Sequence, residues 1–402
     1  MNIKSLLIGS AAALTVVSGA NAADAIVAAE PEPLEYVRVC DAFGTGYFYI
    51  PGTETCLKIG GYVRADFKGG RPGALVARNH LIPGDADYKE IDGGLETSSR
   101  FMLNVSTASD TEYGALKTYS EVRFNVSNGQ DDSADKVVLA FSYIDLAGFR
   151  VGIDESAFVT FPGYLGNVID DDIIAAGPYR TALISYSYEA GNGFSGVVSL
   201  EHDENADVTT YTFDANGRAV NTGTSAKPVY GTKSSRSNYA PNVVAGVGYS
   251  SGAFGLKVVG GYDAEAEEGA VKARIDGTFG AVTAFVAAGW STDGDRVAKY
   301  TNANSITGRR SVLGSNYYAT WGGDWAVWAG VSAPINEKTT FNTQVSYDDN
   351  KNLAAVANVA FTVVPGFVIT PEVVYAKIDD TGLPANVKDD VLAGKVRFQR
   401  SF

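Results

Sequence analysis

Apolar and polar residues alternate along most of the chain from position 57 onward, in segments of about ten residues that turn residues separate. In 57–68, odd positions such as Leu57 and Val63 are apolar, whereas even positions such as Lys58 and Arg64 are charged. Alternation with a period of two is typical of a β-strand whose two faces meet different surroundings. The pattern therefore predicts an all-β protein in which most strands have one apolar and one polar face.

The alternating segments predict sixteen strands. Residues 316–322 could form one more, but bacterial transmembrane barrels have an even number of strands, so we assign this stretch to a loop. The strands are expected to begin near Leu57, Arg100, Ala115, Val137, Phe149, Tyr179, Phe194, Asn242, Phe254, Ala270, Val282, Trp325, Thr340, Leu353, Phe367 and Val391.

The connections between these strands alternate between short and long ones. The short set includes 145–148 and 189–193, and the long set includes 69–99, 155–178 and 201–241. Antiparallel transmembrane barrels have short turns at one end and long loops at the other, and sixteen strands enclose an aqueous channel. We therefore predict a sixteen-stranded antiparallel transmembrane β-barrel with its long loops on the extracellular side.

The first 22 residues differ from the rest and predict a secretory signal peptide. Lys4 supplies a positive charge, an apolar run follows, and Ala20-Asn21-Ala22 fits a cleavage site. A buried N-terminal helix is the alternative. After this segment, no apolar run reaches the length of about 18 residues that a membrane-spanning helix needs. The expected organisation is a signal peptide over 1–22, a periplasmic N-terminal segment over 23–56 and the barrel over 57–402.

The last predicted strand, 391–402, carries Phe398 on its apolar face and ends with Phe402. A terminal aromatic residue on an amphipathic strand resembles the assembly signal of outer-membrane barrel proteins, which implies the barrel-assembly machinery as a partner. Arg400 interrupts the apolar face, but a long side chain near the rim can reach water at modest cost. These features place the protein in the bacterial outer membrane.

Cys40 and Cys56 are the only two cysteines. In an oxidising envelope compartment a disulfide is the default expectation for such a pair. Two free thiols and a zinc pair are the alternatives, and the zinc pair lacks a neighbouring His or Cys that would complete a site. We expect a disulfide that pins the start of the barrel, and no metal site.

The chain carries a formal net charge of −14, which argues against a nucleic-acid partner because such proteins need a basic surface. An enzyme is the main competing class of function. His80 and His202 are the only histidines, and no phosphate-binding loop or metal-spaced cluster occurs. Acid pairs such as Asp170/Asp172 could serve a glycosidase, but acid pairs are common in this chain. We therefore expect no enzymatic activity and no cofactor.

Paired acids fall almost entirely in the predicted extracellular loops. Solubility of exposed loops is the simpler interpretation. The alternative is that divalent cations bridge these carboxylates to anionic lipopolysaccharide, because hard cations prefer clustered oxygen ligands. The pairs are Asp131-Asp132, Glu267-Glu268, Asp348-Asp349, Asp379-Asp380 and Asp389-Asp390.

The third long loop, 155–178, contains many apolar residues on both sides of Asp170-Asp171-Asp172. A freely solvated loop does not need them, so we expect this loop to fold inward against the barrel wall. Folding inward would place Glu155 and the three aspartates in the pore, opposite basic lumen residues. Facing groups of opposite charge would form a constriction that selects small polar solutes and ions, whereas the simpler interpretation is a wetted polar lumen. The candidate basic residues are Arg64, Lys117, Arg123, Lys257, Lys272 and Arg274.

Four segments are similar to the general porin family of alphaproteobacteria. The resemblance extends over nearly the whole chain and implies a sixteen-stranded outer-membrane barrel, assembled as a homotrimer, that passes ions and small hydrophilic solutes by diffusion. It also implies that loop 155–178 folds inward. The long stretch 201–241 matches no motif of that family, and Leu183 is apolar at a lumen position. The four segments are Glu35–Arg64, Phe149–Ser156, Trp321–Gly330 and Val396–Phe402.

Two other functions fit parts of the pattern. A substrate-selective channel would need aromatic residues arranged along the lumen, which the sequence alone does not reveal. A secreted soluble β-sandwich lectin would also alternate, and extraction of the mature protein without detergent would favour it. A TonB-type transporter needs about 22 strands, and this chain is too short. We therefore expect a passive outer-membrane channel in contact with lipid and lipopolysaccharide.

Overall fold

The computed structural model describes residues 38–70, 95–127, 137–202, 209–212, 239–264, 266–292, 309–312, 316–377 and 390–402. The predicted signal peptide over 1–22 lies outside the described residues, as does most of the segment 23–56. In the described part of the chain, no helix has the length and hydropathy needed to cross a membrane.

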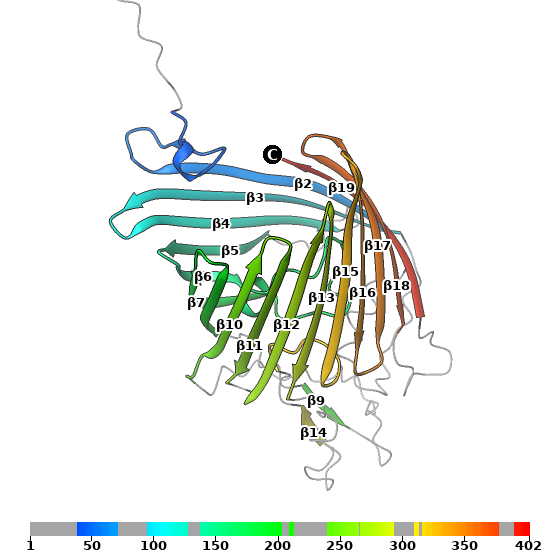
Figure 1. Ribbon diagram of the computed structural model, residues 1–402. Coiled ribbons are helices and arrows are strands. Elements are labelled where there is room, and N and C mark those ends of the chain that lie inside the picture. Colours follow the sequence, from blue (N-terminus) through cyan, green and yellow to red (C-terminus); the bar gives the residue numbers. More distant parts are fainter. Residues whose placement is uncertain are drawn as a thin grey trace, which may run out of the picture. The chain divides into compact units, whose positions relative to one another are not determined.

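Among the described residues, sixteen strands form one antiparallel barrel sheet, shown in Figure 1. These strands are β2 (Cys56–Gly69), β3 (Leu95–Thr111), β4 (Gly114–Ser127), β5 (Val137–Leu146), β6 (Phe149–Glu155), β7 (Arg180–Glu189), β8 (Phe194–His202), β10 (Asn242–Ser251), β11 (Phe254–Asp263), β12 (Glu268–Phe279), β13 (Val282–Ser291), β15 (Trp325–Asn336), β16 (Thr339–Asp348), β17 (Leu353–Val364), β18 (Phe367–Lys377) and β19 (Asp390–Ser401).

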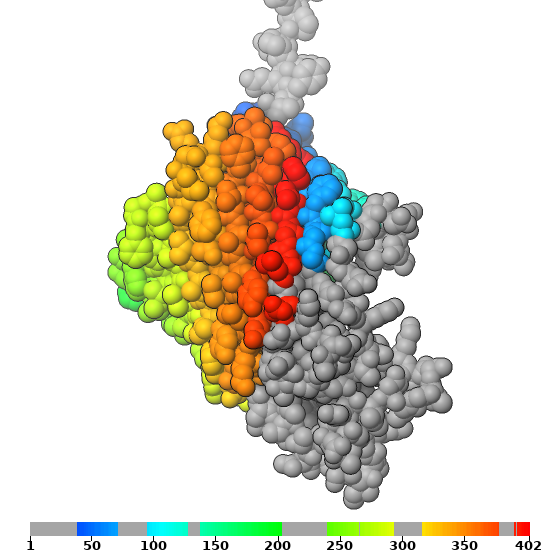
Figure 2. All heavy atoms as spheres, turned by 90° about the vertical axis from the view of Figure 1, so that its right-hand side faces the viewer, coloured from blue at the N-terminus to red at the C-terminus, as the bar shows by residue number. Residues whose placement is uncertain are grey.

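The barrel closes because its last strand pairs with its first. Each strand pairs with the next one along the chain, β8 pairs with β10 and β13 with β15. Strand β19 then pairs with β2 over a register that runs from Gly394↔Gly69 to Ser401↔Tyr62. Figure 2 shows this seam as the red C-terminal strand beside the blue first strand. The terminal Phe402 extends it by exchanging two backbone hydrogen bonds with Gly61, at 3.0 and 3.2 Å.

The predicted strands are confirmed, and residues 316–322 contain no strand. The largest shift in a starting residue is in β3, which begins at Leu95, five residues before the predicted Arg100. Residues 95–99 pair with 65–69 of β2. The sequence concealed this extension because 96–99 are all polar and show no alternation.

Side-chain alternation divides the closed sheet into an outer and an inner face. In β15, Trp325, Val327 and Val331 are exposed, whereas Ala326 and Trp328 between them are buried. The outer face is dominated by apolar side chains, and the inner face carries most of the charged ones. The barrel therefore presents to its surroundings the apolar surface expected of a protein in lipid.

Exposed aromatic side chains gather at both ends of the outer face. Near the short turns they are Phe149, Tyr186, Tyr188, Phe194, Tyr249, Phe254 and Phe279. Near the long connections they are Tyr262, Trp290, Trp325 and Tyr375. Two such girdles are typical of barrels that cross a bilayer, because aromatic rings with a polar edge favour the interface.

A short segment before β2 is joined to the barrel by the predicted disulfide, Cys40–Cys56. The 3-10 helix η2 (Asp41–Phe43) follows Cys40, and β1 (Phe48–Tyr49) pairs with Leu57 and Cys56. Both sulfur-bearing side chains are buried. The cross-link therefore fixes residues 40–55 against the start of β2, in agreement with the sequence-based expectation.

Three further elements lie in the connections. Helix α2 (Ala157–Thr160) follows β6 directly. Strands β9 (Thr209–Thr212) and β14 (Arg309–Val312) form a separate two-stranded antiparallel sheet. Helix α2 begins the connection that contributes to the functional site.

Candidate channel constriction

The connection between β6 and β7, residues 156–179, is called loop 156–179 below. It begins with Ser156, whose Oγ accepts a hydrogen bond from the backbone N–H of Phe158 at 3.1 Å and so caps α2. Serine is a preferred residue at this position because its hydroxyl satisfies an otherwise unpaired amide. Phe158 is fully buried, so the loop turns into the protein from its first residues.

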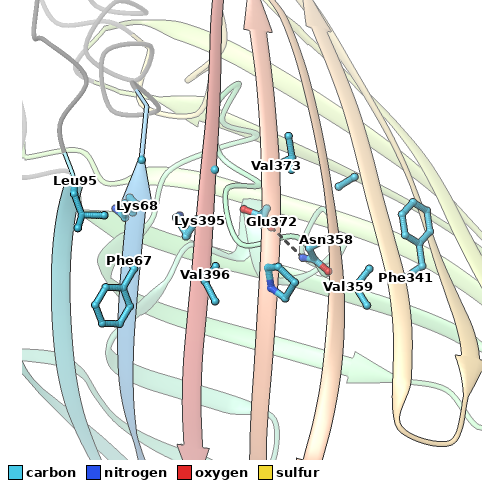
Figure 3. A pocket seen from close by; sticks show the side chains of 14 residues that line it. Phe67, Lys68, Leu95, Phe341, Asn358, Val359, Glu372, Val373, Lys395 and Val396 are labelled. Carbon is cyan, nitrogen blue, oxygen red and sulfur yellow. Dashed lines mark hydrogen bonds between the residues drawn. The ribbon is translucent and has the colours of Figure 1, made fainter.

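The tip of loop 156–179 is held by a buried carboxylate on β18. Glu372 is 2% exposed and accepts hydrogen bonds from the backbone N–H groups of Ile169 and Asp170, the latter at 2.9 Å. Its Oε2 also accepts from Asn358 Nδ2 at 3.0 Å, as Figure 3 shows. On the neighbouring strand, Lys395 forms an ion pair with Asp170. Buried charges persist when they are paired and hydrogen-bonded in this way.

Inner-face side chains of three more strands donate to backbone carbonyls of the loop. Trp328 Nε1 donates to Ile174 at 2.7 Å. Gln344 Nε2 donates to Asp171 at 2.8 Å, and Asn358 Nδ2 to Asn167 at 3.0 Å. Loop 156–179 is therefore fixed along the inner face of β15 to β19.

The apolar side chains of loop 156–179 pack on apolar inner-face positions. The buried loop residues that belong to this cluster are Ala157, Phe158, Leu165, Val168, Ile173 and Ile174. The wall residues include Val244, Val259, Phe285, Trp328, Val356 and Val374. Burial of such side chains stabilises a contact by about 25 cal/mol per Å² of apolar surface. This packing explains why the sequence places so many apolar residues in a polar connection.

Three of the predicted basic residues lie against loop 156–179 and contact its backbone or its rings. Lys272 is buried, donates to the carbonyl of Ala176 at 2.5 Å and lies 4.7 Å from the centre of the Phe158 ring. Arg274 donates to the carbonyl of Tyr164 and, at its Nε, to Asp276 at 2.9 Å. Lys257 lies 5.5 Å from the centre of the Phe161 ring. These cations therefore support the loop from β11 and β12.

A basic cluster lies on the inner face of β19, β2 and β3. Arg397 forms a bidentate pair with Asp66 at 2.8 and 2.9 Å, and Arg64 lies 3.9 Å from the same carboxylate. Arg64 and Arg100 are directly opposite each other in the β2–β3 register. Arg100 Nε in turn donates to Asn125 at 2.5 Å. The Asp66 carboxylate thus lies beside two guanidinium groups, and a third, that of Arg100, belongs to the residue opposite Arg64.

The charged wall continues over β4 to β6. Arg123 donates to Glu121 at 2.6 Å and to the hydroxyl of Tyr179. Arg150 bridges Asp145 and Asp154 at 2.7 and 2.6 Å. These guanidinium groups lie over aromatic rings, which fixes them at a solvated surface.

Lys117 is the sixth predicted basic residue, and it lies apart from the others. It is exposed and opposite Asp145 in the β4–β5 register, close to the short turn that precedes β4. The structure therefore places all six predicted cations on the inner face, but it brings only Lys257, Lys272 and Arg274 to the loop, with Arg123 at its end.

The predicted acids take different positions. Glu155 is the last residue of β6 and is buried, and Asp170 is paired with Lys395. Asp171 is half-buried and Asp172 exposed. Burial, reinforced by the neighbouring Asp172, raises the pKa of Asp171 to about 7. The carboxyl of Asp171 therefore titrates near neutral pH.

Sequence reasoning did not single out Glu372, Gln344 or Asn358, which hold the loop. Alternation could have indicated Glu372 and Asn358, because each is a polar residue flanked by apolar ones within a strand, whereas Gln344 follows the polar Thr343. Lys395 and Arg397 lie at alternate positions of the last strand, on its polar face, but their contacts with Asp170 and Asp66 depend on strand register.

The predicted cation bridges at the acidic pairs lie partly outside the described residues, which include neither 131–132 nor 379–380. Asp348 is buried and accepts hydrogen bonds from the amides of Gly322 and Asn352, so it organises its connection. In the regions that the structure describes, no three His, Cys, Asp or Glu side chains are grouped to hold a metal ion. Cation bridging stays a prediction.

Comparison with known proteins assigns the barrel to a family. A family model described as "Porin subfamily" matches residues 24–395. The chain belongs to this porin family. It is 46% identical over 418 residues to Porin Omp2b of Brucella suis, and 46% identical over 411 residues to Porin Omp2b of Brucella neotomae. Each alignment covers 100% of this chain and 100% of the relative.

Solved structures show the same fold at low sequence identity. The outer membrane channel DcaP of Acinetobacter baumannii has a TM-score of 0.56 at 15% identity, covering 88% of this chain and 99% of that one. An anion-selective porin from Comamonas acidovorans has a TM-score of 0.51 at 14% identity, covering 87% and 100%. Both are consistent with the closed barrel.

Family membership and the barrel together establish what the protein does. This porin is a passive channel in the bacterial outer membrane, and it is not an enzyme. Its inner face lines the channel. Sixteen strands enclose a lumen wide enough for water.

Proposed function

We propose that loop 156–179 folds into the lumen and narrows this channel, so that solutes pass between the loop and the basic wall of β19 and β2 to β6. The observation that carries the proposal is a set of hydrogen bonds to the loop backbone. Trp328, Gln344 and Asn358 donate to loop carbonyls, and Glu372 accepts from loop amides. These residues lie on four consecutive strands of the inner face. The loop therefore covers one part of the wall and leaves the other part to solvent.

The two sides of this passage carry opposite charge. The loop contributes Asp171 and Asp172, and the facing wall contributes Arg64, Arg100 and Arg397. Like charges directly opposite each other, as in the Arg64–Arg100 pair, destabilise a sheet. A positive potential in the passage is a functional reason for such a pair, because it acts on ions and polar solutes that pass.

The titration of Asp171 tests this function. Its pKa of about 7 lies above the usual 3.8, so the carboxyl is neutral in acid and ionised above about pH 7. Because burial in the docked loop raises this pKa, the docked loop favours the neutral carboxyl. Docking is therefore strongest below about pH 4 and weakens as pH rises through 7. We expect permeability for cations relative to anions to increase between pH 6 and pH 8, as measured by reversal potentials in a salt gradient.

Two asparagine variants provide the control. Asp171→Asn should remove the pH step. Asp172→Asn should keep a step but move it to lower pH, because the charge of Asp172 contributes to the raised pKa of Asp171. A wild-type channel whose selectivity is independent of pH over this range, with Asp171→Asn behaving identically, would contradict the position proposed for the loop tip.

We further propose that three copies of this chain assemble through the outer face of β3 to β5. Hydroxyl groups gather there: Thr107 and Thr118 are 2.6 Å apart, and Ser120 and Ser142 are 3.2 Å apart. In the barrel strands from β6 to the last one, as far as the structure describes them, Thr343 is the one serine or threonine at a mid-strand outer position. Hydroxyls are disfavoured in lipid but serve well where transmembrane surfaces pack together.

A bulky residue distinguishes a packed surface from a lipid-facing one. Ser120→Trp should shift the protein from trimer toward monomer, because overpacking typically costs about 1–3 kcal/mol at each contact. Thr343→Trp should leave the trimer intact, because lipid accommodates the indole. Native electrophoresis of detergent-extracted protein measures both, and equal behaviour of the two variants would place the contact elsewhere.

The remaining partners follow from the same surfaces. We propose that the final strand, with Phe398 and Phe402, presents the signal for the barrel-assembly machinery. Phe402 supports this role because its ring stacks 6.4 Å from that of Phe101 at the turn end of the outer face. We also propose contact of the acidic connections with lipopolysaccharide through divalent cations.

A further inference from the structure

A second connection contributes a buried segment to the inner face. Asn316–Trp321 precedes β15, yet Asn316 and Tyr318 are 1% and 0% exposed and Trp321 is also buried. A connection that serves only as an external loop does not bury a tyrosine, an asparagine and a tryptophan. This segment, called the clamp segment below, therefore packs as part of the interior.

Glycines in the wall make room for the two large rings. A Cβ at Gly261 of β11 would lie 2.6 Å from Cγ of Tyr318, and one at Gly289 of β13 would lie 2.8 Å from Cη2 of Trp321. Both glycines are at inner-face positions of their strands, so a larger residue at either would exclude the ring. The clamp segment is thus fitted to this part of the wall.

Polar contacts fix the backbone of the clamp segment. Asn316 Nδ2 donates to the carbonyl of Gly269 at 3.0 Å. The amide of Tyr317 donates to Asp263 at 2.8 Å, and its hydroxyl donates to the carbonyl of Arg180 at 3.0 Å. The clamp segment is therefore attached to β11, β12 and β7 independently of loop 156–179.

The clamp segment also contacts loop 156–179 at both of the loop's ends. At the start of the loop, Glu201 of β8 is 1% exposed and accepts hydrogen bonds from Ser156 Oγ at 2.7 Å, from the amide of Ala157 at 2.8 Å and from the hydroxyl of Tyr318 at 3.2 Å. The rings of Tyr318 and Phe158 are 5.2 Å apart.

At the other end, the amide of Gly177 donates to Thr320 Oγ1 at 2.8 Å. Two groups of the clamp segment, the ring of Tyr318 and the hydroxyl of Thr320, thus contact Phe158 and Gly177 near the two ends of the loop. Such a pair of contacts restrains the opening of the loop at its two roots, while Glu372 restrains its tip.

We propose that Asn316–Trp321 is a positioning element of the channel, which holds the two roots of loop 156–179 and thereby sets the width of the passage. The proposal rests on the proposed function of the loop as the constriction. Tyr318 is its central positioning residue, because it joins the clamp segment to Glu201 and to Phe158. Loss of the Tyr318 contacts allows the loop to leave the wall more often, while the sixteen-stranded sheet stays closed.

The test compares Tyr318→Ala and Tyr318→Phe with the control Tyr188→Ala, which removes a tyrosine from the outer face. Two measurements and a check of folding are made on the full-length folded protein. Chymotrypsin cleavage within loop 156–179, mapped by mass spectrometry, reports how often the loop opens. Single-channel recording in planar bilayers reports mean conductance and its fluctuation, and the heat-induced shift in electrophoresis reports that the barrel is intact.

Tyr318→Ala is expected to increase cleavage in the loop about tenfold or more and to broaden the conductance distribution, with an unchanged heat-induced shift. Tyr318→Phe keeps the ring and removes one hydrogen bond, so it should show a smaller change in the same direction. If Tyr318→Ala lowers the heat-induced shift, its barrel is not intact, and the result for Tyr318→Phe alone then tests the proposal. Tyr188→Ala should match the wild type in both measurements.

The outcomes separate the clamp from the constriction. A loop that stays resistant to chymotrypsin in both Tyr318 variants overturns the clamp and leaves the constriction in place. A loop that becomes cleavable while conductance and its fluctuation stay unchanged supports the clamp, but contradicts the proposal that the loop narrows the channel.

Discussion

Glu372→Ala is expected to free the tip of loop 156–179 and to make the single-channel conductance larger and noisier. The carboxylate accepts hydrogen bonds from the amides of Ile169 and Asp170, and both would be left without this acceptor. An unpaired buried amide costs about 1–3 kcal/mol, so docking of the tip should weaken by a factor of roughly thirty or more. Recording in planar bilayers, at several voltages, measures the change.

Two variants define the cause of that effect. Glu372→Gln keeps one carbonyl acceptor and should give an intermediate conductance. Asp145→Ala removes an inner-face carboxylate that pairs with Arg150 on the neighbouring strand, away from the strands that hold the loop tip. It should therefore leave the conductance noise unchanged. If Glu372→Ala conducts like the wild type with equal noise, the loop tip does not border the passage.

The second large effect concerns selectivity. Replacing both Arg64 and Arg397 by serine should shift the channel strongly toward cations, because Asp66 then loses both of its guanidinium neighbours. Two unit charges about 4 Å apart interact by about 1 kcal/mol even in bulk water, which is about a fivefold effect on local ion concentration for each charge removed. Reversal potentials in a salt gradient should therefore move by tens of millivolts.

Arg400→Ser is the control for net charge, because it removes one positive charge from the rim of the outer face, whereas the double variant removes two. Arg400 donates to the carbonyl of Pro365 at a turn and does not face the lumen. Its reversal potential should equal that of the wild type. A shift in the control about half as large as that in the double variant would mean that net charge, and not the basic cluster, determines selectivity.

The barrel wall was predictable because its signal is local. Whether Val327 faces outward and Trp328 inward follows from a period of two, and the long and short connections follow from where alternation stops. The same rule placed Lys272 and Arg274 on the inner face. It failed at 95–99, where polar residues on both faces conceal the first part of β3.

The contacts of loop 156–179 were not predictable in the same way. The loop's apolar residues indicated that it packs on something, but Asp170 and Lys395 are 225 positions apart, and no local pattern pairs them. Strand register and barrel closure bring them together. For the same reason the sequence showed residues 316–322 only as part of a loop, and did not indicate that Tyr318 is buried beside Phe158.

Single-channel recording of the purified, refolded protein in planar bilayers tests the central claim most directly. A passive water-filled channel should give stepwise increases in current that scale linearly with voltage and with salt concentration. The account would be contradicted by protein that inserts into the bilayer and never conducts, although its heat-induced electrophoretic shift shows an intact barrel. That result would indicate a lumen closed by loop 156–179.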